Sequence, residues 1–460
     1  MPIQVKATTA DAYKLIHDGA LALARAEREG IRVDIEYCEK KKKHLTKKIK
    51  HYHSKLKGTK FYTKWESIYG GKTNIYSNYQ LSRLLYHIMK IEPPKTTASG
   101  QGSTDDDALN QINMPELKII LKIRKLTKVR DTYLHAFVRE QYNGYIHPTF
   151  HLHTVRTFRS SSSDPNFQNI PKRDKESMQI CRRALLPHPG AMLAEADFSA
   201  IEVMISACYH RDPVMLKYLK DKNSDMHADM AKQIFMLDDL DRSQPAHSTL
   251  RTAAKNGFVF PQFYGDYYLN NAMSLAEWVK LPQAAWGENK GLVLPNGQYI
   301  SDHFRGNGIK SFQQFVKYVE KVEDDFWNNR FKIYNSWRKA WVKQYRKQGS
   351  LKMFTGFTCS GVMRENEIIN YPIQGSAFHC LLFTFIELDR IMMQEKWRTK
   401  LLGQIHDSIV MNIYPEEFDH VKQTIFNIVN KILPSAWDWI TVPLEIDLEV
   451  YGIDKPWIAA

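Results

Sequence analysis

The chain has 460 residues, of which 43% are hydrophobic and 12% aromatic, so it is long enough for a large core and is excluded from the disordered class. Lysine and arginine exceed aspartate and glutamate by 64 to 50, which gives a net charge of +14. This basic balance favours binding to nucleic acid or to an anionic membrane surface, although many basic proteins bind neither.

The five cysteines are scattered along the chain and no CxxC pair occurs, which argues against both a zinc site and a disulfide framework. A reducing, cytoplasmic setting fits this pattern. Residues 1–6 lack the apolar core of a signal peptide. The longest apolar stretch, Cys380–Ile386, is far too short to span a bilayer. We therefore expect no membrane attachment.

Helical patterns dominate the first 140 residues. Residues 11–57 are predicted to be helical, with a stop at Gly30 and a short strand or turn at Ile31–Asp34. The lysine-rich run within 40–50 predicts either a solvated helix face or a face that follows a phosphate backbone. By composition, residues 93–107 form a loop, and helical periodicity returns from Leu117 to Val138.

Strand patterns appear in the second third of the chain. A strand is predicted from Tyr145 to Phe150, followed by a polar, turn-rich loop at Thr157–Pro171. Residues 192–197 and 401–413 are predicted to be central strands.

The segments between these strands are predicted to be mainly helical, at residues 226–285 and 311–348. The glycine- and asparagine-rich residues 287–310 are predicted to be an inserted loop. Such a loop is either a tolerated surface insertion or an additional contact with DNA or a partner.

Two aspartates follow or interrupt the apolar runs of the central strands. Asp197 follows Ala194–Ala196, and Asp407 lies within 404–410. Strand ends can direct two carboxylates to one point, and such a pair can bind two Mg²⁺ about 3.5–4 Å apart for in-line phosphoryl transfer. Taken alone, Asp197 is more simply explained as a cap at a strand end.

A cationic pair lies between the two aspartates in the chain. Arg251 and Lys255 fall four residues apart on one helix face, which suits a triphosphate. In this order the three segments resemble motifs A, B and C of family A DNA polymerases, the bacterial DNA polymerase I type. Asp197–Glu202 resembles the pattern Asp-Tyr-Ser-Gln-Ile-Glu, and residues 406–408 resemble His-Asp-Glu.

The resemblance in motif A implies a metal ligand and a sugar selector. Asp197 matches the aspartate that binds both metal ions, to which the backbone carbonyl of Phe198 would contribute. Glu202 matches the residue that excludes a ribose 2′-hydroxyl, whereas taken alone it would be a surface glutamate. Ala200 and Met204 replace polar residues frequent in the family, which removes polar contacts but leaves the metal site.

Motif C implies the second metal ligand. Asp407 matches the second metal aspartate, and Ser408 stands where the family has a glutamate with a supporting role. We therefore expect activity with altered surroundings of the metal site. Gln404 and His406 match residues near the primer terminus, although either alone would be a polar residue at the edge of the core.

Motif B implies the triphosphate and base contacts. Lys255 matches the lysine near the α-phosphate, Arg251 the arginine at the β- and γ-phosphates, and His227 a histidine that also approaches the triphosphate. Phe260 matches the ring that stacks on the nucleotide, and Tyr264 the tyrosine of the same motif. One extra residue separates Lys255 from Phe260, and a π-bulge would absorb it. Core packing is the alternative role for the phenylalanines.

Two further segments extend the resemblance to the primer–template. Thr157–Pro171 is similar to Thr-Gly-Arg-Leu-Ser-Ser-x-Asp-Pro-Asn-Leu-Gln-Asn-Ile-Pro, with Phe158 in place of the glycine. Asn370–Ser376 is similar to Asn-x-Pro-x-Gln-Gly-Thr. Arg159 would check the shape of the terminal base pair from the minor groove. The DNA contacts implied in this way are Arg159, Asn169, Asn370, Gln374, Gln404 and His406.

The resemblance implies an α+β fold shaped like a right hand, with an antiparallel-sheet palm and mostly helical fingers and thumb. The expected domains are a thumb with a short N-terminal lead at 1–140, palm segments at 141–225 and 349–460, and fingers at 226–348 that include the loop 287–310. The thumb match begins near residue 11, so we expect no proofreading exonuclease in this chain.

The implied activity is template-directed DNA synthesis, in which dNTPs are added to a primer 3′-hydroxyl with two Mg²⁺, or with Mn²⁺ in their place. The implied partners are a DNA template–primer, dNTPs, and a separate exonuclease or processivity factor. We expect a monomer in the cytoplasm, that of the host if the source is a phage or another virus.

Two alternatives stay open. Glu202 and the thumb match argue against a single-subunit phage-type RNA polymerase. Retention of Asp197, Lys255 and Asp407 argues against a non-catalytic DNA-binding replication protein.

Overall fold

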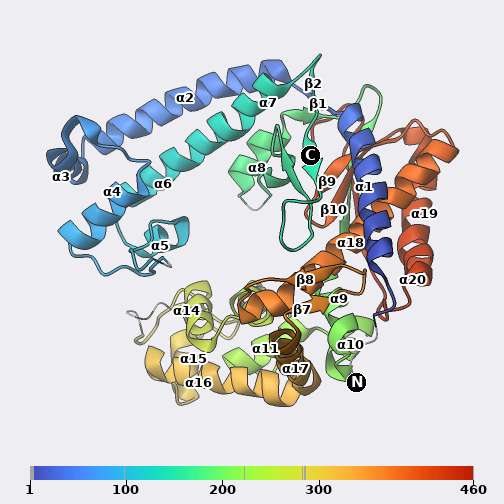
Figure 1. Cartoon of the computed structure of the whole chain (residues 1–460). Coiled ribbons are helices and arrows are strands. Elements are labelled where there is room, and N and C mark those ends of the chain that lie inside the picture. Colours follow the sequence, from blue (N-terminus) through green and yellow to red (C-terminus); the bar gives the residue numbers. More distant parts are fainter. Residues whose placement is uncertain are drawn as a thin grey trace.

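A four-stranded antiparallel sheet forms the centre of the computed structural model, which describes residues 5–97, 99–172, 174–221, 223–281, 283 and 286–458. The strand order is β11–β6–β10–β9, with β6 at Met192–Phe198, β9 at Lys400–Ile405, β10 at Ser408–Ile413 and β11 at Ile446–Val450. Each neighbouring pair is antiparallel. The combination of this sheet with many helices confirms the predicted α+β class (Figure 1).

Helices cover the central strands of this sheet. All residues of β10 are buried, and β6 is buried from Leu193 to Ala196. Helix α1 (Thr9–Glu29) packs against β9 and against α18 (Glu365–Gln394), and α18 also contacts β10. Because these strands lie in the core, their sequences are mainly apolar. The central strand predicted at 192–197 is confirmed. The segment 401–413 instead forms two strands joined by a turn at residues 406–407, with β10 beside β6 and β9 at the edge of the sheet.

The N-terminal helices follow the predicted pattern. Helix α1 ends at Gly30, whose φ of 68° lies in the left-handed region, and the short strand β1 (Ile31–Val33) leads into α2 (Ile35–Lys57). Helix α2 packs against α6 (Pro115–Lys128) and α7 (His135–Glu140), and Figure 1 shows α2 and α6 extending away from the sheet together. The exposed lysines of α2 fit either interpretation of the basic run: Lys40, Lys43, Lys47, Lys48 and Lys50.

The loop predicted at 93–107 extends two residues too far at its C-terminal end. Its residue Ala98 lies outside the described part of the chain. Helix α5 (Asp106–Gln111) begins within the predicted loop, because the Asp105 carboxylate accepts a hydrogen bond from the Ala108 amide and so caps the helix. The neighbouring helices are α3 (Lys60–Tyr69), α4 (Asn78–Ser82), and the π-helical segments η2 (Arg83–Ile88) and η3 (Val129–Leu134).

The helical predictions for 226–285 and 311–348 are confirmed in the described residues, which do not include Pro282, Ala284 and Ala285. The helices of this half are α8 (Lys175–Arg182), α9 (Ile201–His210), α10 (Pro213–Lys220), α11 (Met226–Phe235), α12 (Pro245–Ala254), α13 (Phe260–Phe263), α14 (Tyr268–Trp278), α16 (Phe312–Asp325) and α17 (Lys332–Gln348). Two π-helical segments continue α12 and α16, namely η5 (Lys255–Val259) and η7 (Phe326–Arg330).

The prediction of a plain loop at 287–310 is wrong in part, because the segment contains helix α15 (Ile300–Gly306). Ile300 and Phe304 lie one helical turn apart and are fully buried. The Phe304 ring stacks on Trp286, with ring centroids 5.6 Å apart, and also contacts Phe315 of α16. These large apolar side chains join the insertion to the main hydrophobic core. The glycine and asparagine residues on which the loop prediction rested lie mostly outside this turn.

The remaining elements are short or C-terminal. The strand predicted from Tyr145 to Phe150 is instead two short strands, β2 (Tyr145–Ile146) and β3 (Thr149–His151), which pair in different sheets. The others are β4 (Ser161–Ser163), β5 (Leu185–Leu186), β7 (Ser350–Lys352), β8 (Thr358–Ser360), α19 (Phe418–Asn427), η9 (Ile428–Ile432) and α20 (Leu433–Ala436). Within the described residues no helix has the length and apolar character needed to cross a bilayer.

Candidate active site

The two predicted metal aspartates lie at one edge of the central sheet. Asp197 is the penultimate residue of β6 and pairs in register with Ser408, the first residue of β10. Asp407 occupies the turn before β10, where its backbone carbonyl accepts a hydrogen bond from the Phe198 amide at 3.0 Å. His406 allows the sharp turn by adopting a positive φ of 52°. The β9–β10 hairpin therefore carries Asp407 to the end of β6, as the strand-end argument predicted.

At this sheet edge, ionisation of both Asp197 and Asp407 is unfavourable when no cation is bound. Burial is the main cause that raises the pKa of Asp407 to about 6, and the charges of Glu202 and Asp197 raise it further against the opposing charge of Arg159. The Asp197 side chain is 44% exposed and that of Asp407 33%. Three acids thus act on one partly open space, and a cation there would relieve their mutual repulsion.

The donor set fits a hard divalent cation such as Mg²⁺. Mg²⁺ is commonly held by one or two carboxylates together with substrate phosphates and water. Among the residues that the structure describes, no group of three or more His, Cys, Asp or Glu side chains has ligating geometry. The Lys172 ammonium lies 3.2 Å from Asp197 Oδ2, which shows that this oxygen already attracts a cation.

Glu202 is held from two sides beside this edge. The Tyr264 hydroxyl donates a hydrogen bond to Glu202 Oε2 at 2.7 Å, and Arg159 forms an ion pair with the other carboxylate oxygen. Arg159 also approaches Asp407, with 3.8 Å between Nη2 and Oδ1. Burial, followed by the Glu202 charge, raises the pKa of the Tyr264 hydroxyl. The tyrosine therefore stays protonated and keeps Glu202 in a fixed position.

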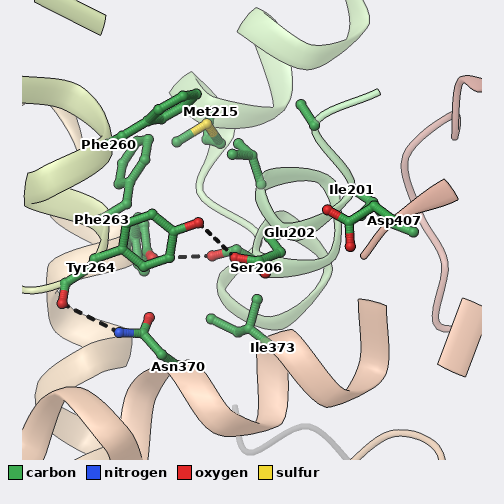
Figure 2. Close-up of a pocket in the computed structure, with 13 residues that line it drawn as sticks. Ile201, Glu202, Ser206, Met215, Phe260, Phe263, Tyr264, Asn370, Ile373 and Asp407 are labelled. Carbon is green, nitrogen blue, oxygen red and sulfur yellow. Dashed lines mark hydrogen bonds between the residues drawn. The ribbon is translucent and has the colours of Figure 1, made fainter. Parts of the chain in front are cut away.

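A pocket opens between these groups and the helix that carries Phe260 (Figure 2). Figure 2 shows Phe260, Phe263 and Tyr264 on one wall, with Glu202 opposite them and Asp407 beyond it. The amide of Asn370, on α18, donates to the Tyr264 carbonyl at 3.4 Å. The pocket thus combines aromatic faces with a few polar groups and ends near the aspartate edge, as expected of a site that orients a flat, polar ligand.

The basic residues of motif B gather on the same helix. Lys255 Nζ lies 5.2 Å from the centre of the Phe260 ring. Arg251 forms a bidentate pair with Asp225 at 2.7 and 3.1 Å. His227 stands edge-on to Phe260, and burial together with Arg251 and Lys255 lowers its pKa to about 4. His227 is therefore neutral at physiological pH, and the positive charge of this group comes from Arg251 and Lys255.

The extra residue of motif B is absorbed as predicted. Residues 255–259 form the π-helical segment η5, and α13 starts directly after it. Pro261 lies in a continuous helical run, since Val259 has helical backbone angles, and the π-helical segment directly before it is where the regular hydrogen-bond pattern is already interrupted. Phe258 and Val259 are fully buried, whereas Phe260 lines the pocket. Of these three side chains, only that of Phe260 reaches the pocket.

The polar loop at 157–171 approaches the hairpin from the other side. Phe158 has a positive φ of 60°, a conformation that glycine adopts at little cost, which accounts for the glycine of the family pattern. Its ring packs against Phe357, with centroids 5.0 Å apart. The Gln404 amide oxygen accepts hydrogen bonds from Ser160 Oγ and Gln168 Nε2, each at 2.6 Å.

The predicted DNA contacts differ in their accessibility. Gln404 is only 3% exposed, so in this structure its side chain offers little surface to a primer, and its DNA contact stays a prediction. Asn169 and His406 are exposed, and Asn370 and Gln374 are partly exposed. Arg159 is engaged with Glu202 rather than directed away from the protein.

Three charged residues near Asp197 were not predicted from the sequence, namely Glu195 and its partners Arg182 and Lys172. Glu195 lies two residues before Asp197 on β6, and its side chain is 3% exposed. It pairs with Arg182 at 3.0 Å and with Lys172 at 3.2 Å. The sequence did contain a signal for Glu195. It is a glutamate inside an otherwise apolar strand, two residues from Asp197, and this spacing places both side chains on one face of the strand.

Comparison with known proteins gives one family. The model of DNA polymerase family A matches residues 36–455. DNA polymerase I of Synechocystis sp. is 26% identical over 444 residues, which cover 93% of this chain and 40% of the relative. DNA polymerase I of Aquifex aeolicus is 28% identical over 432 residues, which cover 92% and 64%. The chain thus spans less than two thirds of the length of either relative.

A solved structure shares the fold. The POL domain of Pol1 from M. smegmatis, in a complex with DNA primer-template and dNTP, superimposes with a TM-score of 0.72 at 24% identity. The match covers 96% of this chain and 69% of that one.

Proposed function

The chain belongs to DNA polymerase family A, and from this premise we propose that it is a template-directed DNA polymerase that adds dNTPs to a primer 3′-hydroxyl. The observation that carries the proposal is the position of Asp197 and Asp407 at one sheet edge, beside a pocket closed by Glu202 and Tyr264. The charges of Arg251 and Lys255 lie on the helix that forms the far wall. This order of groups suits a nucleotide whose phosphates lie near the aspartates.

Asp197, Asp407 and the Phe198 carbonyl would hold two Mg²⁺, for which Mn²⁺ can substitute. Such a pair, when bound, lowers the pKa of the attacking hydroxyl and stabilises the leaving oxygen. No side chain of the chain then needs to act as a strong base. The protein supplies position and charge, which is the main requirement of phosphoryl transfer.

To bind the triphosphate, Arg251 would exchange its carboxylate partner for a phosphate. Arg251 now pairs with Asp225, and its planar guanidinium can form the same bidentate contact with a phosphate. Lys255 contributes a point charge one turn later, and neutral His227 a hydrogen bond. Phe260 would stack on the base.

The arrangement of helices around the sheet suits the proposed domains. The sheet and α18 would form the palm, the helices within 1–140 the thumb, and those within 226–348 the fingers, which frame the sheet from different sides in Figure 1. DNA would pass over Asn169, Asn370, Gln374 and His406. Arg159 would exchange Glu202 for the minor groove of the terminal pair. The monomeric state, the cytoplasmic location, an accessory factor and a viral origin stay predictions.

A primer-extension assay tests the proposed function. The purified chain with Mg²⁺ and a primed template should extend the primer with dNTPs and fail to do so with NTPs. Preferential use of NTPs would favour the RNA polymerase alternative. Binding of the duplex without extension under both conditions would favour a non-catalytic replication protein.

Phe260 is predicted to set the use of dideoxynucleotides. The family pattern ties a phenyl ring at this position to rejection of ddNTPs and a tyrosine to acceptance, so Phe260→Tyr should increase ddNTP incorporation relative to dNTP. Phe258→Tyr is the matched control, because Phe258 is fully buried and does not line the pocket. Steady-state competition between ddNTP and dNTP gives the ratio. An increase with Phe258→Tyr and none with Phe260→Tyr would show that the motif is aligned wrongly.

Proofreading is predicted to be absent from this chain. Residues 36–455 match the polymerase family, and the proposed function assigns them to the polymerase alone. A primer with a mismatched 3′ end should therefore keep its length when incubated with Mg²⁺ and no nucleotide. A mock preparation from cells that do not produce the chain, purified in parallel, controls for contaminating nuclease. Shortening by the wild-type preparation that is absent from this control would contradict the prediction.

A further inference from the structure

A second buried acid lies on the same face of β6 as Asp197. Side chains two residues apart on a strand point to the same face, so Glu195 and Asp197 are neighbours. The Glu195 carboxylate is almost completely removed from solvent, with 3% exposure, whereas that of Asp197 is 44% exposed. A buried carboxylate is costly unless it is paired and hydrogen-bonded, so its contacts indicate what it does.

The contacts of Glu195 connect it to both metal motifs. Ser408 Oγ donates a hydrogen bond to Glu195 Oε1 at 2.9 Å. Lys172 Nζ lies 3.2 Å from Glu195 Oε1 and 3.2 Å from Asp197 Oδ2, so one ammonium is shared by the two acids. Arg182 pairs with Glu195 Oε2 at 3.0 Å and is held against the Trp457 ring. Despite its burial, the charges of Arg182 and Lys172 keep the pKa of Glu195 below its usual value.

Ser408 is the position at which the sequence departs from the His-Asp-Glu pattern. Its side chain is buried and in contact with a carboxylate that comes from the neighbouring strand. A glutamate at 408 would place a second acid against Glu195 in a space that already holds one. A glutamate at position 195 on β6 and a glutamate at position 408 on β10 would therefore occupy the same space. This chain has the glutamate on β6.

We propose that Glu195 is a positioning residue of the metal site, which supplies from β6 the carboxylate that Ser408 lacks on β10 and receives the Lys172 ammonium when a divalent cation occupies Asp197. This inference rests on the proposed function. In the structure Lys172 competes for Asp197 Oδ2, and Glu195 gives the ammonium a second anion at the same distance. Movement of Lys172 between the two acids would keep the charge of this part of the site balanced with and without the cation.

The test exchanges the two residues and measures metal binding directly. Mn²⁺ binding to the full chain is followed by the electron paramagnetic resonance signal of free Mn²⁺. The binding that remains in Asp197→Ala is taken as binding elsewhere on the protein and is subtracted. Glu195→Gln should weaken site-specific Mn²⁺ binding by about 10–100-fold, the range for residues that support metal ligands. Ser408→Glu alone should also weaken it, because like charges meet in a buried space.

The exchanged protein, Glu195→Ser with Ser408→Glu, should recover most of the lost affinity, since residues in direct contact couple in a double-mutant cycle. Glu449→Gln is the matched control, because it removes an exposed charge from the position opposite Glu195 on β11 and should leave Mn²⁺ affinity almost unchanged. Primer extension by the same proteins should follow the order of Mn²⁺ affinity.

Lys172→Gln provides a variant at a half-exposed position in case the Glu195 variants do not fold. It should bind Mn²⁺ more tightly than wild type, because no ammonium competes for Asp197. Wild-type affinity in Glu195→Gln, no recovery in the exchanged protein, or weaker binding by Lys172→Gln would each overturn the inference while the wild-type extension activity stands. A wild-type protein that neither extends a primer nor binds Mn²⁺ would overturn the proposed function as well.

Discussion

Asp197→Ala and Asp407→Ala should each lower the rate of primer extension by more than about 100-fold, since even residues that only support metal ligands cost 10–100-fold when replaced. Both carboxylates lie at the same sheet edge, and the two nearby acids are engaged by other partners. Glu202 is held by Tyr264 and Arg159, and Glu195 by Arg182 and Ser408. Binding of duplex DNA should be almost unchanged, because contacts from Lys and Arg to phosphate dominate affinity. Single-turnover extension and duplex binding are measured on the same proteins.

Stability separates a catalytic loss from unfolding. The pKa of Asp407 is raised from its ordinary value of 3.8 to about 6, mainly by burial, so its ionisation costs folding free energy that grows between these two pH values and is fully present above them. Asp407→Asn removes this cost and should unfold at the same or a higher temperature than wild type at pH 8. The difference should shrink as the pH falls from 6 to 4, where the wild-type carboxyl becomes protonated. Extension above a tenth of the wild-type rate in either alanine variant would contradict the metal assignment.

Glu202→Ala should relax discrimination against NTPs by about one to two decades. The Glu202 carboxylate is fixed by Tyr264 and Arg159, so a ribose 2′-hydroxyl meets an occupied wall without a suitable partner. An unsatisfied polar group costs about 1–3 kcal/mol, and each 1.4 kcal/mol corresponds to a tenfold change. Incorporation of dNTPs should also slow somewhat, because Glu202 lies directly after the strand that carries Asp197.

Two variants control this experiment. Glu202→Gln keeps the size of the side chain and a hydrogen-bond acceptor for Tyr264, and should change the dNTP to NTP ratio less than Glu202→Ala. Tyr264→Phe removes the 2.7 Å hydrogen bond but keeps the ring, and should change the ratio in the same direction as Glu202→Ala. The ratio comes from kcat/KM for each nucleotide. An unchanged ratio in Glu202→Ala would place sugar selection elsewhere in the pocket.

Much of this site could be predicted from local sequence, because its parts lie on regular elements. The apolar runs before Asp197 and around Asp407 required buried strands, and short buried strands at adjacent positions bring their ends together. The π-helical segment followed from the resemblance, because the chain has one residue more between Lys255 and Phe260 than the family spacing, in a segment that had to stay helical. In both cases the physical constraint acts within a few residues of the chain.

The parts that could not be predicted depend on contacts between distant segments. The link from Glu195 to Ser408 joins residues 213 positions apart, and that from Glu195 to Lys172 joins two separate elements. Arg251 pairs with Asp225, which lies 26 positions earlier in the chain. The sequence of the helix that carries Arg251 therefore could not predict which side chain binds it when no nucleotide is present. Helix α15 was missed because loop-forming glycines flank Ile300 and Phe304, and only their burial shows the packing that fixes the turn.

Template-directed incorporation of a single nucleotide tests the central claim most directly. Four primed templates that differ only in the first unpaired base are each offered one dNTP at a time with Mg²⁺. The account predicts that each primer is extended by one residue with the complementary dNTP, and that no extension occurs with Asp197→Ala. Addition that ignores the templating base, or no addition by a folded wild-type chain that binds the duplex, would contradict it.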